Sequence, residues 1–228
     1  MNKRVLILTG ASDILYPNES PSYVELSDKT LASKERYAKK HGYDIMTLRS
    51  FGSDFKFGFS DTNVGHLRAI RAFESLEYYD IVMWVDADAV ITNENLAISE
   101  FPIQEDVIFY ASYDWMGRGS FSTGNFILQR TNQINEFFNV FLQISKQTND
   151  EQHAFNIMYA QTPLRSIMRV LDWGYLNAVP SQVMESSCWR DRQRISYSWK
   201  PGDFLAHLTG ITIPDRFDIL EKHFKEYL

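Results

Sequence analysis

Mainly apolar runs recur along the first half of the chain and alternate with segments that carry helical signals. Val5–Leu8, Tyr43–Leu48 and the long run Ile81–Ile91 are bounded by polar residues, which is typical of strands buried in a sheet. Between them, capping residues and apolar spacing predict a helix from Ser27 or Asp28 to about Lys40 and another from about Val64 to Tyr79. Strands that alternate with helices predict an α/β fold with right-handed crossovers.

The second half of the chain is less regular. Val107–Ala111 and Phe126–Leu128 are predicted strands, and an apolar stripe at helical spacing predicts a helix from Thr131. Further helices are expected from near Asp150 to about Ala160 and from Asp215 to the end. Three connections are rich in turn-forming residues, namely 13–21, 52–63 and 112–125. Because no repeat or linker interrupts the pattern, we expect a single domain over residues 1–228.

The composition excludes several classes of protein. Hydrophobic residues are 44% and charged residues 23% of the chain, as in ordinary soluble proteins, and the net charge of −6 provides no basic surface for nucleic acid. Cys188 is the sole cysteine, so no intrachain disulfide can form, and we expect it to be structural or incidental. No apolar run approaches the ~18–20 residues of a membrane span. A strand starting at Val5 leaves no room for a signal peptide, so we expect a cytoplasmic protein, or one whose membrane anchor has been removed.

Two carboxylates interrupt the most apolar run of the chain. Asp86 and Asp88 have the i, i+2 spacing that places both side chains on one face of a strand. Because burying two unpaired carboxylates costs several kcal/mol each, we expect them at the C-terminal end of the strand, sharing a divalent cation such as Mn²⁺ or Mg²⁺. Ligands of open α/β sheets bind at that edge. A cation there can bridge to a diphosphate, which indicates a glycosyltransferase that uses a nucleotide-sugar.

Five segments, in this order, resemble one known family. They are Tyr37–Asp44 (YAKKHGYD), Met83–Ala89 (MWVDADA), Ser122–Leu128 (STGNFIL), Glu151–Asn156 (EQHAFN) and Gly202–Gly210 (GDFLAHLTG). The family is the GT-A-fold α-galactosyl- and α-xylosyltransferases, which includes fungal α-1,2-galactosyltransferases and plant xyloglucan xylosyltransferases. The resemblance implies a mixed, mostly parallel sheet flanked by helices. It also implies a retaining enzyme that moves galactose, xylose or glucose from a UDP-sugar to a glycan or other hydroxyl acceptor.

The resemblance also assigns roles to single residues. His207 would be the third metal ligand beside Asp86 and Asp88, although a lone histidine after an apolar run is more often a core residue. The predicted donor contacts are the uracil edge near Thr9, Gly10 and Ala11, the backbone at Ala87, and the donor sugar near Thr123, Gly124 and Asn125.

Two further groups of residues have both a structural and a functional interpretation. Glu151 and Gln152, with Asp150, are expected around the reacting sugar, but the same segment also fits the start of a helix that Asp150 caps. His66 and Arg68 lie near the N-terminus of a predicted helix, where a diphosphate is favoured, or else on a solvated helix face.

Some features keep alternatives open. His66 stands where the family usually has a lysine, and Thr212 stands where the xylosyltransferases have another. A non-catalytic nucleotide-sugar-binding module is therefore an alternative, as is a sugar nucleotidyltransferase, although the chain lacks a glycine-rich basic loop after its first strand. Aromatic residues in polar segments indicate either an acceptor cleft or ordinary packing; they are Tyr113, Trp115, Trp189, Tyr197 and Trp199.

Overall fold

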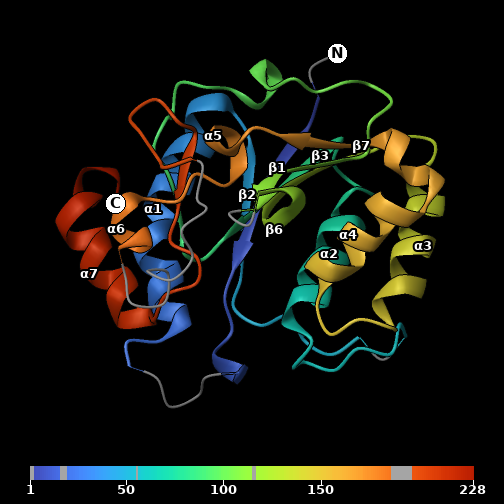
Figure 1. Ribbon diagram of the computed structural model, residues 1–228, viewed down its shortest axis with the longest axis horizontal. Coiled ribbons are helices and arrows are strands. Elements are labelled where there is room, and N and C mark those ends of the chain that lie inside the picture. Colours follow the sequence, from blue (N-terminus) through green and yellow to red (C-terminus); the bar gives the residue numbers. More distant parts are fainter. Residues whose placement is uncertain (1–2, 16–19, 55, 115–116, 186–196) are drawn as a thin grey trace.

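A computed structural model describes residues 3–15, 20–54, 56–114, 117–185 and 197–228. Its centre is a six-stranded sheet of order β2-β1-β3-β6-β5-β7 (Figure 1). The strands are β1 (Val5–Gly10), β2 (Asp44–Leu48), β3 (Ile81–Asp86), β5 (Phe109–Asp114), β6 (Gly117–Gln129) and β7 (Met168–Leu171). Only β6 is antiparallel to its two neighbours in this sheet, so the predicted mixed, mostly parallel sheet is confirmed.

Helices cover both faces of this sheet. In Figure 1, α2 (Val64–Ser75), α3 (Ile134–Ser145) and α4 (Glu151–Gln161) lie on one side, while α1 (Tyr23–His41), α6 (Ser181–Met184) and α7 (Ile213–His223) lie on the other. The helix α5 (Trp173–Leu176) follows β7 directly. Short 3-10 turns complete the fold at Asp13–Leu15, Ile98–Glu100, Pro163–Ile167 and Lys225–Tyr227. Among the described residues, no helix combines the length and the apolar character that crossing a bilayer requires.

The strand β3 is buried on both faces, which explains why its sequence is apolar up to its last residue. Val82 and Trp84 pack into the core beneath α2, α3 and α4, whereas Ile81, Met83 and Val85 pack into a second core on the opposite face. Successive side chains point to opposite faces of the sheet, and both faces are buried. Every position of the strand is therefore apolar until the strand ends. The first polar residue is Asp86, the last residue of β3.

Several element boundaries differ from the sequence-based expectations. The helix α1 begins at Tyr23, because Ser22 and Glu25 form a capping box inside a segment that looks like a loop. Its end at His41, before Gly42 in the left-handed conformation, is confirmed. The helix α2 ends at Ser75 rather than Tyr79. Most of 112–125 is strand rather than loop, since β5 and β6 pair through Ser112 and Ser122 beyond an irregular step in the register.

Candidate active site

The pairing of two short strands brings the candidate metal ligands together. Asp86 ends β3, Asp88 follows in the turn, and β4 (Ala89–Ile91) pairs antiparallel with β8 (Leu205–His207). Ala89 therefore lies opposite His207, although 118 positions separate them. The imidazole Nε2 lies 3.3 Å from Asp88 Oδ1 and 3.9 Å from Asp86 Oδ2. One ligand atom from each of the three residues lies within 4.8 Å of the other two, so a single cation could contact all three.

The orientation of the His207 ring is set by Asn177. Asn177 donates from Nδ2 to the Tyr113 carbonyl at 2.9 Å, so its Oδ1 faces His207 Nδ1 at 2.7 Å. Because an amide oxygen can only accept, Nδ1 carries a proton and Nε2 is the ring nitrogen directed at the two aspartates. His207 is only 2% exposed, so this ring is both a buried residue and a ligand aimed at the carboxylates.

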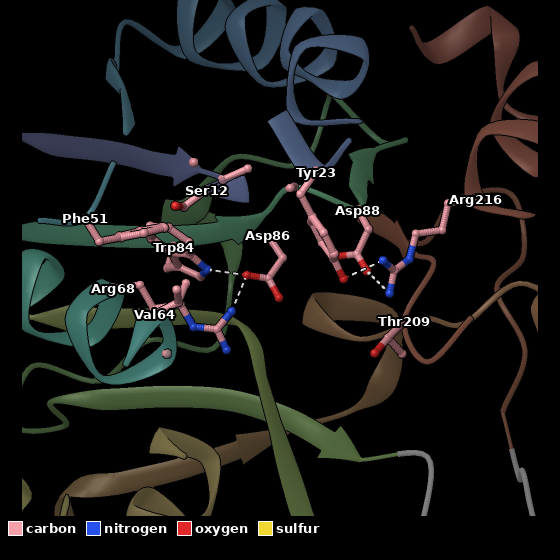
Figure 2. Close-up of a pocket in the computed structure, with 14 residues that line it drawn as sticks. Ser12, Tyr23, Phe51, Val64, Arg68, Trp84, Asp86, Asp88, Thr209 and Arg216 are labelled. Atoms are coloured by element: carbon pink, nitrogen blue, oxygen red, sulfur yellow. Dashed lines mark hydrogen bonds and ion pairs between the residues drawn. The ribbon is translucent and has the colours of Figure 1, made fainter. Parts of the chain in front are cut away.

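Asp88 lies against a cation from the end of the chain. Arg216 of α7 places Nη2 at 3.2 Å from Asp88 Oδ2 (Figure 2). Burial alone would raise the pKa of Asp88, but Arg216 and His207 outweigh it and hold this pKa below its usual range.

Asp86 belongs to a different network, centred on Arg68 of α2. The Arg68 guanidinium donates to Asp86 Oδ1 with one nitrogen and to Glu151 Oε1 with another, while Trp84 Nε1 donates to Asp86 Oδ1 at 2.6 Å. Burial raises the pKa of Asp86 despite Arg68. For Glu151, burial acts in the same direction, but Arg68 and the Thr123 hydroxyl at 2.9 Å lower the pKa below its ordinary value. Glu151 is thus a buried carboxylate held in its ionised form.

Two glycines allow these networks to approach one another. A Cβ at Gly124 would lie 2.4 Å from His207 Cε1 and 2.9 Å from Asp86 Oδ2, so only glycine lets β6 pass beneath the ligands. A Cβ at Gly65 would lie 1.7 Å from Glu151 Oε2, so only glycine lets α2 approach the start of α4. Both positions need glycine because of close approach rather than an unusual backbone angle.

The strand β6 and the helix α4 complete the floor of the site. Thr123 donates its backbone N–H to Gln152 Oε1 at 3.1 Å, and Gln152 Nε2 donates to Asp114 Oδ2 at 3.3 Å. Asn125 Oδ1 accepts from the Asp86 N–H at 3.1 Å. Among the described residues, Asn125 Nδ2 is one of the few buried side-chain donors without a hydrogen-bond partner.

A pocket of about 300 Å³ opens over this edge of the sheet, at the carboxyl ends of β1 and β3. Gly10 and Ala11 line it. In Figure 2, Ser12, Trp84 and Arg68 lie to one side of the two aspartates, and Tyr23 and Arg216 lie to the other. Asp86, Ala87 and Asp88 lie at its base. The structure therefore brings Gly10, Ala11, Arg68 and the aspartate turn together at one pocket.

Nine of the predicted site residues do not line this pocket, namely Thr9, His66, Thr123, Gly124, Asn125, Asp150, Glu151, Gln152 and His207. Thr9 is fully buried within β1 and does not line the pocket. The His66 ring stacks on Phe59 with centroids 4.9 Å apart, because His66 lies on the buried face of α2. Asp150 accepts from the His153 N–H at 2.7 Å and caps α4, so the structural interpretation of this exposed residue holds. Cys188 lies outside the described residues.

Sequence reasoning missed three charged or polar residues beside the metal ligands. Arg216 and Tyr23 come from opposite ends of the chain, and no local pattern pairs either of them with an aspartate. Lys34 is fully buried in α1 and donates from Nζ to the Asp86 carbonyl at 2.8 Å. Burial lowers the pKa of Lys34 to about 7. Helical spacing puts Lys34 on the same face as Tyr37 and Ala38, and this pattern could have indicated that Lys34 is buried.

The aromatic residues separate into two groups. Trp199 packs edge-on against Phe224 at 4.9 Å, so it belongs to the core beneath the end of the chain. Trp173 stacks on Tyr197 with centroids 5.9 Å apart, and Tyr113 joins this aromatic stack tilted by 43° against Trp173 at 5.1 Å. Trp173 Nε1 also donates to the Asp114 carbonyl at 3.2 Å, which links this stack to Gln152 through Asp114. Trp115 and Trp189 lie outside the described residues.

Comparisons with known proteins support the same assignment of fold. Residues 1–108, just under half of the 228, match the profile of the galactosyl transferase GMA12/MNN10 family. A glycosyltransferase involved in the glycosylation of the major capsid of PBCV-1 superposes with a TM-score of 0.64 at 17% identity, over 96% of this chain and 98% of its own. The chain has the GT-A glycosyltransferase fold.

Other GT-A structures are similar at lower scores. The glycosyltransferase GlyE of Streptococcus pneumoniae TIGR4 gives a TM-score of 0.56 at 14% identity, over 91% of this chain and 55% of its own. Mouse xyloside xylosyltransferase 1 gives 0.51 at 11% identity, over 92% and 99% of the two chains. No curated protein sequence matches this chain. At these identities the likeness establishes the GT-A fold, and the chemistry rests on the residues of the site.

Proposed function

We propose that this protein is a metal-dependent, retaining glycosyltransferase that moves a hexose or pentose from a UDP-sugar to a hydroxyl of a glycan acceptor. One observation carries the proposal: three metal-ligating side chains and a buried, ionised glutamate converge at one edge of a GT-A sheet. The match of residues 1–108 to a galactosyl transferase family supports sugar transfer. Galactose, xylose and glucose all remain candidate sugars.

The chemistry of the ligand set supports a divalent cation. Two carboxylates and a neutral imidazole suit Mn²⁺ or Mg²⁺, and the space beneath them exists only because residue 124 is glycine. Asp86, Asp88 and His207 would hold the ion. When bound, it would act as a Lewis acid that stabilises the charge developing on the departing diphosphate.

The remaining residues of the pocket fit the other parts of a nucleotide-sugar. The turn Gly10–Ser12 after β1 would receive the nucleoside, since ligands of such sheets bind at the carboxyl ends of the strands. Asn125 Nδ2 would donate to a hydroxyl of the donor sugar. The aromatic stack of Tyr113, Trp173 and Tyr197 offers apolar ring faces near Asp114, where an acceptor sugar could pack.

Glu151 is the residue that would act on the reacting carbon. Positive charge develops at the anomeric centre as the bond to the diphosphate breaks, and a fixed carboxylate stabilises that charge without reorganising. Arg68 and Thr123 hold Glu151 ionised and in place, while Gln152 extends from the same turn of α4. Retention of configuration is proposed from the family resemblance.

Screening UDP-galactose, UDP-xylose and UDP-glucose for Mn²⁺-dependent hydrolysis tests this function, because many transferases slowly use water as an acceptor. The proposal predicts release of UDP from at least one donor, loss of that release with EDTA, and loss in Asp88→Asn. A nucleotidyltransferase would instead form pyrophosphate from UTP and a sugar 1-phosphate. A non-catalytic module would bind UDP-sugar with no turnover in the presence of acceptor glycans, and either result would contradict the proposal.

A further inference from the structure

Arg216 is a buried cation that faces the pocket from the C-terminal helix. It is 6% exposed, and three of its nitrogens are engaged: Nε donates to the Leu208 carbonyl at 2.9 Å, Nη1 to the Tyr23 hydroxyl, and Nη2 to Asp88 (Figure 2). The first two contacts hold the guanidinium in position. The third joins it to a candidate metal ligand.

Asp88 is approached from two sides. Its Oδ1 faces His207 Nε2 at 3.3 Å, toward the candidate metal position, and its Oδ2 faces Arg216 at 3.2 Å. A divalent cation between the three ligands would place a second positive centre on the same carboxylate. The cation and Arg216 would then repel each other and compete for the charge of Asp88.

The other arginine of the pocket is not placed in the same way. Arg68 bridges two carboxylates, Asp86 and Glu151. If one of them binds another cation, Arg68 still has an ion pair with the other. Arg216 has Asp88 as its carboxylate partner, and its hydrogen bonds to the Leu208 carbonyl and the Tyr23 hydroxyl are to neutral oxygens. Of the two arginines that line the pocket, Arg216 would therefore be stabilised more by an anion that binds there.

We propose that Arg216 is an exchangeable cation, which neutralises Asp88 while the pocket is empty and passes to a phosphate oxygen of the nucleoside diphosphate when metal and donor bind together. This deepens the proposed function and rests on it. A guanidinium suits the exchange because its planar donors match a phosphate as well as a carboxylate. Tyr23 and the Leu208 carbonyl would keep the side chain at the rim of the pocket during the exchange.

The proposal predicts opposite effects on metal and nucleotide. Without nucleotide, Arg216 opposes the metal, so Arg216→Gln should bind Mn²⁺ several-fold more tightly than the wild type, as measured by the electron paramagnetic resonance signal of free Mn²⁺. With saturating Mn²⁺, the same variant should bind UDP at least ten-fold more weakly by calorimetry. Its affinity for uridine, which lacks phosphate, should be unchanged.

Arg36→Gln is the matched control. Arg36 of α1 also ties down the end of the chain, through the Tyr227 and Leu228 carbonyls and Glu94, but does not line the pocket. It should leave Mn²⁺, UDP and uridine affinities unchanged. If Arg216→Gln does not fold, Arg216→Lys keeps the charge but loses the forked donors. It should then bind UDP several-fold more weakly with unchanged uridine affinity, and undiminished UDP affinity would overturn the proposal.

A structural role alone gives a different pattern. If Arg216→Gln weakens Mn²⁺, UDP and uridine binding together, Arg216 only holds α7 in place and the exchange is wrong. If a folded Arg216→Gln protein binds UDP with unchanged affinity, the proposed exchange is wrong, but the proposed glycosyltransferase function is not affected. Failure of the wild type to bind UDP with Mn²⁺ overturns both the exchange and the proposed glycosyltransferase function, so the two failures are distinguishable.

Discussion

The two sides of the pocket neutralise their aspartates in different ways. On the side of α2 and α4, Arg68 lies between Asp86 and Glu151, and two glycines allow the backbones to close around this network. On the side of α1 and α7, Asp88 meets Arg216 and His207, and the buried Lys34 donates to the backbone carbonyl of Asp86. The first side, with two carboxylates around Arg68, is the anionic side, and the second, where Arg216 and the buried Lys34 accompany a single aspartate, is the cationic side. This difference fits the proposed function, in which the anionic side would face the sugar and the exchangeable Arg216 of the cationic side would face the diphosphate.

The largest expected effect comes from breaking the Arg68 bridge. Arg68→Met would leave two buried carboxylates without their shared cation, and removing one partner of a buried ion pair costs about 3–5 kcal/mol. Denaturant unfolding at pH 7 should show a loss of this size. A loss below about 1 kcal/mol would mean that water, or protonation of Asp86 and Glu151, compensates for the missing guanidinium. Arg68 would then not hold this side of the pocket in place.

Glu151→Gln should come next. The variant keeps the shape of the side chain but removes the charge that the anomeric carbon needs, so turnover should fall by about 10²–10³ with a smaller change in KM for the donor. Asp150→Asn is the neighbouring control, since Asp150 caps α4 and replacing it should cost on the order of 1 kcal/mol of stability with turnover retained. Steady-state kinetics on both variants check this. Near-full turnover in Glu151→Gln would refute the role of the anionic side.

Asn177 offers a smaller test on the cationic side. Asn177→Leu removes the acceptor that fixes the His207 tautomer, and losing such a partner lowers metal affinity by about 10–100-fold. Asn177→Asp keeps an acceptor at the same place and should retain most of the affinity. Mn²⁺ titration of both variants distinguishes them. Equal affinity in the leucine variant and the wild type would show that Asn177 does not orient the ligand.

Lys34 predicts a pH dependence of stability. Burial lowers its pKa to about 7 in the folded protein, against 10.5 for the free side chain. Between these pH values the unfolded chain binds one more proton than the native protein, so the free energy of unfolding rises with pH, by at most about 1.4 kcal/mol per pH unit. Denaturant unfolding between pH 7 and 10 should show this rise in the wild type relative to Lys34→Met. Parallel pH profiles would mean that Lys34 titrates normally.

Features that depend on neighbouring residues in the chain could be predicted from the sequence. Alternating strands and helices indicated the sheet, and the apolar run around Asp86 placed the turn because a strand buried on both faces excludes charge until it ends. The helix start at Asp150 followed from capping chemistry. His207 entered through the resemblance, and the β4–β8 pairing brings it to the aspartates.

The missed features depend on contacts between distant segments. The polar and glycine residues of β6 resemble a loop, but Thr123 bonds to Gln152 and Glu151 of α4, and Gly124 lies against His207 and Asp86. His66 looked like an anion contact because it is near a helix N-terminus, yet the rotation of α2 turns it into the core. Arg216 meets Asp88 through packing of the last helix beside the first, which no local spacing encodes.

The central claim is that Asp86, Asp88 and His207 hold a cation that recruits a nucleoside diphosphate. Calorimetry of UDP with and without Mn²⁺, on the wild type and on Asp88→Asn, tests it most directly. The account predicts that wild-type UDP binding requires Mn²⁺ and that Asp88→Asn removes the Mn²⁺-dependent part while the protein stays folded. UDP binding of equal affinity with and without Mn²⁺, unaltered by Asp88→Asn, would contradict it.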